Sequence, residues 1–131
     1  QRLGSRHVMV VHARDGLDEI SISGRTDVAE LKDGRIDCYS IAPEDFGLAS
    51  AALASVQVEG PEESLAMLKA ALANEPGPAR DIVVLNAGAA IYVAGAAESL
   101  AAGVDKAQET LAAGKALERL EALVALSNET A

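Results

Sequence analysis

The chain has 131 residues, of which half are apolar and 24% are charged, and its formal net charge is −9. This length and composition fit one globular domain and exclude a disordered or collagen-like chain. The acidic balance, with two tyrosines and one phenylalanine as the aromatic residues, argues against a nucleic-acid groove, which combines clustered Lys and Arg with stacking rings. We therefore expect no nucleic-acid partner.

A cytoplasmic protein is expected. Cys38 is the single cysteine and cannot form a disulfide within the chain, which fits a reducing compartment. The most apolar run, residues 82–94, contains Asn86 and is shorter than the roughly 20 residues of a membrane span, so we expect no membrane partner. The sequence opens on Gln1 without a signal pattern, and we expect it to begin inside a longer protein.

In chain order, the first predicted element is the last turn of a helix at residues 2–4, closed by Gly4 in the left-handed conformation. The uninterrupted apolar run VMVV at residues 8–11 is typical of a strand buried on both faces of a parallel sheet. No second run of this kind follows, so we expect its parallel neighbours to come from sequence outside the chain.

A small antiparallel element is predicted next. The segment ISIS at residues 20–23 alternates apolar and polar side chains, as a half-exposed strand does. Two further strands are predicted at residues 26–31 and 35–41, because Asp33 and Gly34 between them supply the positive φ of a tight hairpin turn.

Four helices are predicted in the remainder, after a loop that Phe46 and Leu48 hold to the core. Their ranges are residues 61–74, 80–94, 98–113 and 115–126. The first presents Leu65 and Leu68 on one face, and the second is apolar on all sides, which indicates a central helix covered all round. From Ser127 onward a frayed tail is expected. The predicted fold class is α/β, with one buried strand, a small antiparallel element and four C-terminal helices.

One cluster of polar side chains occupies the position in the predicted fold where ligands commonly bind. It lies just past the carboxyl end of the buried strand, where open α/β sheets bind ligands, and comprises His12, Arg14, Asp15, Asp18 and Glu19. Adjacent Asp18 and Glu19 supply the oxygen ligands that Mg²⁺ takes beside water and substrate phosphates, which favours a phosphorylated substrate. An adjacent Asp-Glu pair belongs to a solvent-exposed acidic turn more often than to a metal site, so the pair alone leaves both interpretations open.

The other polar candidates have structural interpretations. His12 is a core histidine or a strand-end polar residue more often than a catalytic base, and Cys38 is expected to be a small buried apolar residue. Asn86 is expected to hydrogen-bond nearby backbone, while Arg80 and Asp81 are expected to cap their helix or to pair on the surface. The sequence has no Cys/His metal cluster, no nucleophile beside a base and no glycine-rich phosphate loop.

A family resemblance begins at the same cluster. The segment VVHARDGLDEIS at residues 10–21 resembles the "VVHG.DGLDE.S" segment of the anthranilate phosphoribosyltransferases. Further segments that look like the family's own follow in the same order: VAEL at 28–31, the strand of Tyr39, PEDFGL at 43–48, LNAGAA at 85–90 and GKAL at 114–117. The resemblance covers essentially the whole chain.

The resemblance implies that residues 1–131 are the C-terminal part of a nucleoside phosphorylase/phosphoribosyltransferase-type α/β domain. In this family the pair at Asp18 and Glu19 holds Mg²⁺ against the pyrophosphate of phosphoribosyl pyrophosphate. The amine of anthranilate then attacks the ribose, a step of tryptophan biosynthesis carried out by a homodimer. The N-terminal helical domain and the glycine-rich loop would precede Gln1, so we expect this chain alone to be inactive.

The sequence departs from the family at Ala13, where glycine is common. Two other interpretations stay open. The parent is a related nucleoside phosphorylase, which attacks the ribose with phosphate instead of anthranilate, or the chain is a non-catalytic remnant that acts as a binding module.

Overall fold

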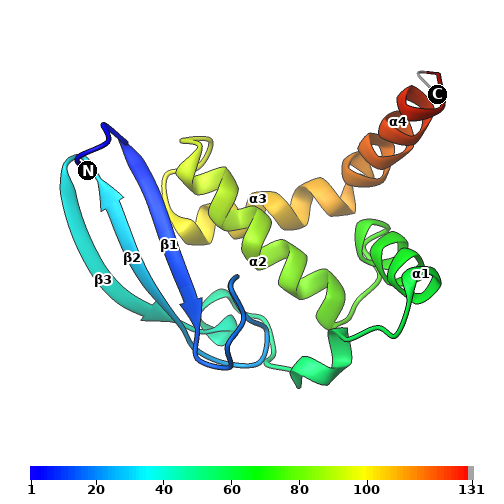
Figure 1. The fold of residues 1–131 in the computed structure, drawn as a ribbon, viewed down its shortest axis with the longest axis horizontal. Helices are drawn as coiled ribbons and strands as arrows, with labels where there is room; N and C mark the ends of the chain where they lie inside the picture. The colour runs from blue at the N-terminus through cyan, green and yellow to red at the C-terminus, as the bar shows by residue number, and fades with distance from the viewer. Residues whose placement is uncertain (130–131) are drawn as a thin grey trace.

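A computed structural model describes residues 1–129, with a three-stranded sheet on one side and four helices on the other (Figure 1). The strands are β1 (His7–Ala13), β2 (Thr26–Lys32) and β3 (Arg35–Ile41), and the sheet order is β1-β2-β3. Two short 3-10 helices follow, η1 (Pro43–Phe46) and η2 (Leu53–Val56). The α-helices are α1 (Pro61–Leu72), α2 (Pro78–Val93), α3 (Leu100–Ala112) and α4 (Lys115–Glu129). The predicted α/β class is confirmed.

The neighbour of β1 within the chain is antiparallel, and the parallel neighbours expected from outside the chain stay a prediction. The strand pairs antiparallel with β2, with Val10 opposite Ala29, and it has no parallel partner within residues 1–129. Met9 and Val11 pack against the core, whereas Val10 is 64% exposed, so β1 is not buried on both faces. An apolar run indicates a strand but does not indicate the direction of the strand beside it. Here the short connection at residues 14–25 returns the chain as an antiparallel neighbour.

The predicted hairpin is confirmed. β2 and β3 are antiparallel with Lys32 opposite Arg35, and the two residues between them have φ of 51° at Asp33 and 77° at Gly34. Positive φ at both positions matches the right-handed twist of the flanking strands. Gly4 also has positive φ, as predicted, but it closes an isolated turn instead of a helix.

The segment predicted as a strand at residues 20–23 has no strand structure. Ile20, Ser21 and Ile22 are all buried, so the alternation of the sequence does not correspond to two faces. Their backbone groups bond side chains and a loop instead of a strand ladder: the amide of Ser21 donates to Thr26 Oγ1, and the carbonyl of Ile22 accepts from the amide of Ala51.

The core lies between the sheet and α2. Its buried members are apolar and come from every layer: Ile20, Ile22, Val28, Ile41, Leu48, Val84, Leu85, Ala89, Val104, Ala107 and Leu111. Phe46 packs against this cluster, so Phe46 and Leu48 hold their loop to the core as predicted. α2 is the central helix, although Ala90 on it reaches solvent.

Two glycines allow α2 and α3 to pack closely. A Cβ atom on Gly103 would lie 2.3 Å from the carbonyl oxygen of Gly88, and one on Gly88 would lie 2.7 Å from the Cα of Val104. Both distances are shorter than a van der Waals contact, and the opposing atoms belong to backbone. Any larger residue at either position would therefore push the helices apart.

The outer helices are less covered than predicted. Leu65 and Leu68 of α1 are 49% and 42% exposed. α4 extends away from the rest of the molecule and has no buried residue (Figure 1). It remains helical through Glu129, which corrects the expected tail from Ser127, and the last two positions of that tail lie outside the described residues. Within the described chain no helix has the length and apolarity that a bilayer crossing requires.

Candidate functional site

The predicted metal-binding pair lies on the connection between β1 and β2. Asp18 and Glu19 are both exposed, and within residues 1–129 neither carboxylate takes part in a hydrogen bond or an ion pair. Their oxygens are therefore available to a ligand. The backbone around the pair, in contrast, is fixed on both sides.

Asp15 fixes the first side of this connection. Its carboxylate accepts hydrogen bonds from the hydroxyls of Ser21 and Ser23, and from the amide of Leu17 at 3.1 Å. The hydrogen bond from Ser21, followed by that from Ser23, holds the pKa of Asp15 below its ordinary value. Because these bonds occupy its oxygens, Asp15 closes the loop and is not free to bind a ligand with the pair.

Arg14 and His12 are separated from the pair. The guanidinium of Arg14 binds Asp27 on β2, with 2.9 Å between Nη2 and Oδ1, and this contact lowers the pKa of Asp27. His12 lies opposite Asp27 in the strand register and is exposed, so it is not a core histidine. The predicted five-residue cluster therefore divides into an ion pair at Arg14, a loop closure at Asp15, an exposed histidine on β1 and a free carboxylate pair.

The donor set fits a particular kind of metal. Within residues 1–129 no group of three or more His, Cys, Asp or Glu side chains could enclose an ion. Mg²⁺ takes one or two carboxylates from a protein and keeps water and phosphate oxygens as its other ligands. Asp18 and Glu19 suit a Mg²⁺ ion that arrives with a phosphorylated ligand.

An apolar pocket of about 460 Å³ opens beside the pair. Glu19 and Leu17 lie on one wall, and Met67 and Leu68 of α1 lie on another, with η2 and α2 completing the lining. A ligand held at Glu19 would thus have apolar side chains next to it.

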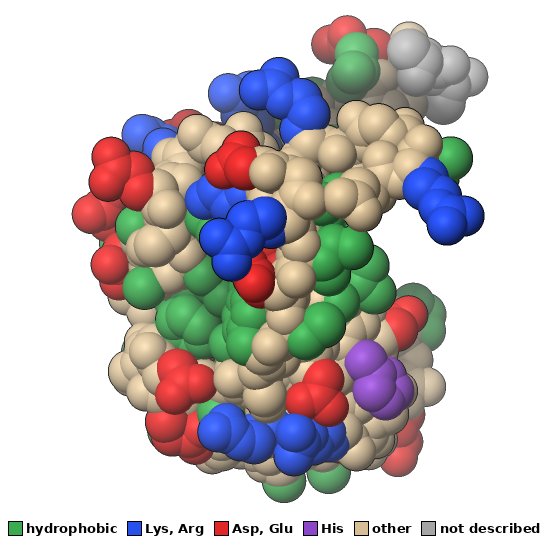
Figure 2. Space-filling model, turned by 90° about the vertical axis from the view of Figure 1, so that its left-hand side faces the viewer, with side chains coloured by type: hydrophobic (Ala, Val, Ile, Leu, Met, Phe, Trp, Pro, Cys, Tyr) green, Lys and Arg blue, Asp and Glu red, His purple; other side chains and the backbone are tan. Residues whose placement is uncertain are grey.

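Cys38 is exposed, which corrects the expectation of a buried thiol. The register places it next to Ala29, which in turn is next to Val10, so the three share one face of the sheet. Val10 shows that this face is open, and Figure 2 shows apolar side chains gathered in the middle of the sheet side with charged ones around them. A small apolar residue type indicates burial only when a layer covers its face.

The other polar predictions hold. Asn86 bonds backbone, as expected, at Ile82 in its own helix and at Ile20 in the loop. Arg80 forms an ion pair with Asp81, with 3.0 Å between Nε and Oδ1.

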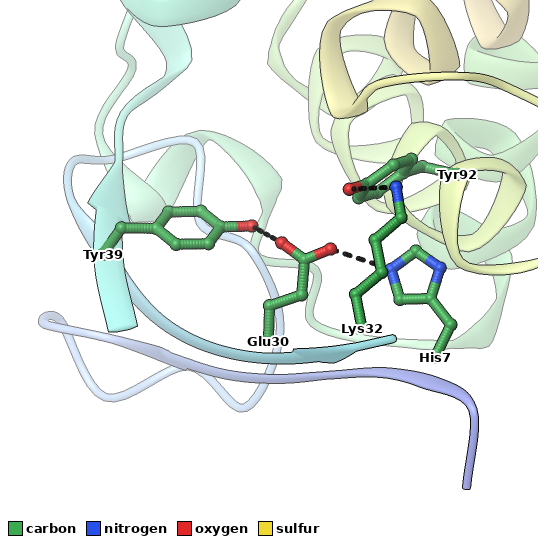
Figure 3. A network of polar contacts seen from close by, with 5 residues as sticks. All are labelled: His7, Glu30, Lys32, Tyr39 and Tyr92. Atoms are coloured by element: carbon green, nitrogen blue, oxygen red, sulfur yellow. Dashed lines mark hydrogen bonds and ion pairs between the residues drawn. The ribbon is translucent and has the colours of Figure 1, made fainter. Parts of the chain in front are cut away.

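A polar network at the opposite end of β1 has no counterpart in the sequence analysis (Figure 3). Glu30, which is 9% exposed, lies 2.8 Å from His7 Nε2 and accepts a hydrogen bond of 2.7 Å from the hydroxyl of Tyr39. Lys32 Nζ donates to the hydroxyl of Tyr92 at 3.1 Å, and the ring of Tyr92 meets that of His7 edge to face. Glu30 follows Val28 by two residues on β2, so the two side chains point to the same face of the sheet. Its position on the core face could therefore be predicted from the sequence.

Burial raises the pKa of Glu30, but its contacts with Tyr39, Tyr92 and His7 outweigh that effect and hold the pKa below its ordinary value. Burial and the neighbouring Glu30 both raise the pKa of Tyr39. The network therefore favours an ionised Glu30 facing a neutral phenol.

Three comparisons place the chain among known proteins. The sequence profile of the glycosyl transferase family, a/b domain, matches residues 1–117. The anthranilate phosphoribosyltransferase of Nitrosomonas europaea is 59% identical over 128 residues, which are 98% of this chain and 38% of that protein. That of Methylococcus capsulatus is 55% identical over 131 residues and is likewise matched over 38% of its length.

Solved structures agree with the sequence relatives. The crystal structure of anthranilate phosphoribosyltransferase from Thermus thermophilus superposes with a TM-score of 0.83 at 42% identity, over 95% of this chain and 36% of that one. The enzyme from Saccharomyces cerevisiae in complex with PRPP and Mg superposes with a TM-score of 0.76 at 26% identity, over 88% of this chain and 33% of that one. The chain thus spans less than two fifths of the length of these relatives.

Proposed function

The chain belongs to the glycosyl transferase family through its a/b domain, and from this premise we propose that it forms the C-terminal part of the catalytic domain of an anthranilate phosphoribosyltransferase. The observation that carries the proposal is the 59% identity, over 98% of the chain, to a protein of that name. The reaction transfers the phosphoribosyl group of phosphoribosyl pyrophosphate to anthranilate. The bond from ribose C1 to the pyrophosphate oxygen breaks, a bond from C1 to the anthranilate nitrogen forms, and pyrophosphate leaves.

In this proposal Asp18 and Glu19 hold Mg²⁺ at the pyrophosphate. The ion supplies stabilisation of the negative charge that develops on the leaving oxygens. Support comes from the two exposed, unengaged carboxylates and from a relative whose structure contains PRPP and Mg. The chain's own residues contribute a fixed loop, because Asp15 and its serine partners close it before the ligand arrives.

The test uses the complete protein with Asp18→Asn and Glu19→Gln, which keep side-chain size but remove the charge. We expect each to lower kcat/KM by about 10²-fold or more and to raise the Mg²⁺ concentration needed for half-maximal rate. Asp33→Asn, at the exposed hairpin turn, is the matched control and should leave both quantities unchanged. An unaltered Mg²⁺ requirement in both site variants would contradict the metal role.

We also propose that the 131-residue chain alone is inactive, because one metal-binding pair cannot position two substrates. Incubating the isolated chain with anthranilate, phosphoribosyl pyrophosphate and Mg²⁺ should leave the fluorescence of anthranilate constant. Substrate-dependent loss of that fluorescence would refute this proposal. In the complete protein we propose a homodimer in the cytoplasm. Light scattering on the purified enzyme would verify or reject the dimer.

A further inference from the structure

A side chain of α2 is bonded to the backbone that directly follows the carboxylate pair. Asn86 Nδ2 donates to the carbonyl of Ile20 at 2.9 Å, and Asn86 Oδ1 accepts from the amide of Ile20 at 2.9 Å. Both backbone groups of one residue are thus paired with one amide side chain. Since Ile20 is 3% exposed, water does not readily replace either bond if Asn86 is lost.

The amide of Asn86 is itself held in one orientation. Its Nδ2 also donates to the carbonyl of Ile82, one turn earlier in α2, at 3.0 Å. A flipped amide would place its oxygen against two carbonyl oxygens, so the observed orientation is the one that satisfies every group. Asn86 is therefore a rigid attachment point on the central helix.

The other side-chain hydrogen bonds of the loop do not connect it to a helix. Asp15 joins residues 15–23 to each other, and Thr26 Oγ1 accepts from the amide of Ser21. These bonds close the loop on itself and on β2, but they do not attach it to a helix. Within residues 1–129, Asn86 is the helical side chain that hydrogen-bonds this loop.

We infer that Asn86 is a positioning residue for metal binding, which fixes the backbone immediately after Asp18 and Glu19 relative to the helical layer. The inference rests on the proposed function of that pair. Partners that orient metal ligands without touching the ion typically change metal affinity by about 10- to 100-fold when removed. A purely structural asparagine would change stability and leave metal affinity alone.

The test compares variants of the complete protein. Asn86→Leu keeps the volume and removes all three hydrogen bonds, whereas Asn86→Asp keeps the acceptor for the Ile20 amide and loses the donor. Glu30→Gln is the matched control, because it perturbs buried hydrogen bonds at the other end of the sheet. Asp18→Asn reports on the pair itself.

Three quantities are measured besides thermal stability. Electron paramagnetic resonance gives the affinity for Mn²⁺, which shares the oxygen ligands of Mg²⁺, in the presence of phosphoribosyl pyrophosphate. Steady-state kinetics gives the half-saturating Mg²⁺ concentration and the KM for anthranilate. We expect Asn86→Leu and Asn86→Asp each to weaken metal affinity about 10-fold, because the aspartate sets a carboxylate oxygen against the carbonyls of Ile20 and Ile82, with the anthranilate KM within about 2-fold of the parent. Glu30→Gln should lower stability without changing metal affinity.

Opposite outcomes are distinguishable. If Asp18→Asn weakens Mn²⁺ binding and the Asn86 variants do not, the inference fails and the proposed metal pair stands. If none of the variants weakens binding, the metal role of Asp18 and the inference fail together. If Asn86→Leu does not fold, Asn86→Asp decides the matter by the same criterion.

Discussion

The loop at residues 14–25 and the α2–α3 helix pair are fixed by opposite means. The loop has little regular structure, and hydrogen bonds from Asp15, Thr26 and Asn86 determine its shape. The helix pair depends on the absence of side chains at Gly88 and Gly103, where backbone meets backbone. One region has a unique arrangement because every polar group needs a partner, and the other because close packing leaves no space.

The difference shows which region tolerates change. A loop held by separate hydrogen bonds loses about 1 kcal/mol for each bond removed and keeps the others. A close backbone contact fails as a whole, since a single added methyl group must displace a helix. Functional variation is therefore easier to accommodate in the loop than in the layer beneath it.

The largest expected effect is that of Gly103→Ala. The new Cβ would lie 2.3 Å from the carbonyl oxygen of Gly88, so α3 must move, and we expect a loss of about 3 kcal/mol in the free energy of unfolding. Urea denaturation measures this loss. Gly24→Ala is the matched control in the loop, because its Cβ meets no atom within 4 Å, and it should change stability little. Equal effects of the two substitutions would remove the contrast between the regions.

Glu30→Gln extends the comparison to the polar network of β1 and β2. We expect the free energy of unfolding to fall by about 2 kcal/mol at about pH 7, because the substitution replaces hydrogen bonds to an ionised group by weaker neutral ones. The folded-state pKa of Glu30 is lowered, so its contribution is present above the ordinary carboxyl value and is lost as the pH falls through the folded pKa. The difference in melting temperature between the parent and the variant should therefore shrink on acidification.

The control for this pH dependence is Glu109→Gln on the exposed side of α3. It should track the parent across the same pH range. A Glu30→Gln difference that stays constant from neutral to acidic pH would show that the charge of Glu30 contributes nothing.

The smallest effect is expected for Thr26→Val in the loop's own network. The side chain is fully buried and keeps its shape, but the amide of Ser21 loses its acceptor, which costs about 1.5 kcal/mol. Thr110→Val on α3 is the control, because its hydroxyl donates within its own helix. A Thr26→Val loss comparable to that of Gly103→Ala would mean that the loop fails as a unit, like the helix pair.

The sequence predicted the elements whose cause is local. Gly34 adopts positive φ without strain and Asp33 tolerates it, so the hairpin turn was readable from these two residues themselves. Prediction from the sequence failed where the structure of a segment depends on residues far away in the chain. Nothing within VMVV specifies that β2 returns antiparallel beside it, and nothing within ISIS specifies that Asn86, 66 residues from Ile20, bonds its backbone.

The candidate site divides in the same way. Residues at a strand end indicated the location of Asp18 and Glu19, but their chemistry came from the resemblance, because two adjacent acids also make an ordinary surface turn. The sequence did not separate Arg14 and Asp15 from the pair. Their partners, Asp27 and the serines, lie on other parts of the backbone.

The central helix α2 carries both Asn86, which binds the loop, and Tyr92, which joins the network at the far end of β1. Six positions separate them, a rise of about 9 Å along the axis. One inserted residue between them would rotate all that follows by about 100°, so the two attachments could not be satisfied together. The length of this interval is therefore fixed more strictly than the identity of the residues within it, and relatives should vary there by substitution and not by insertion or deletion.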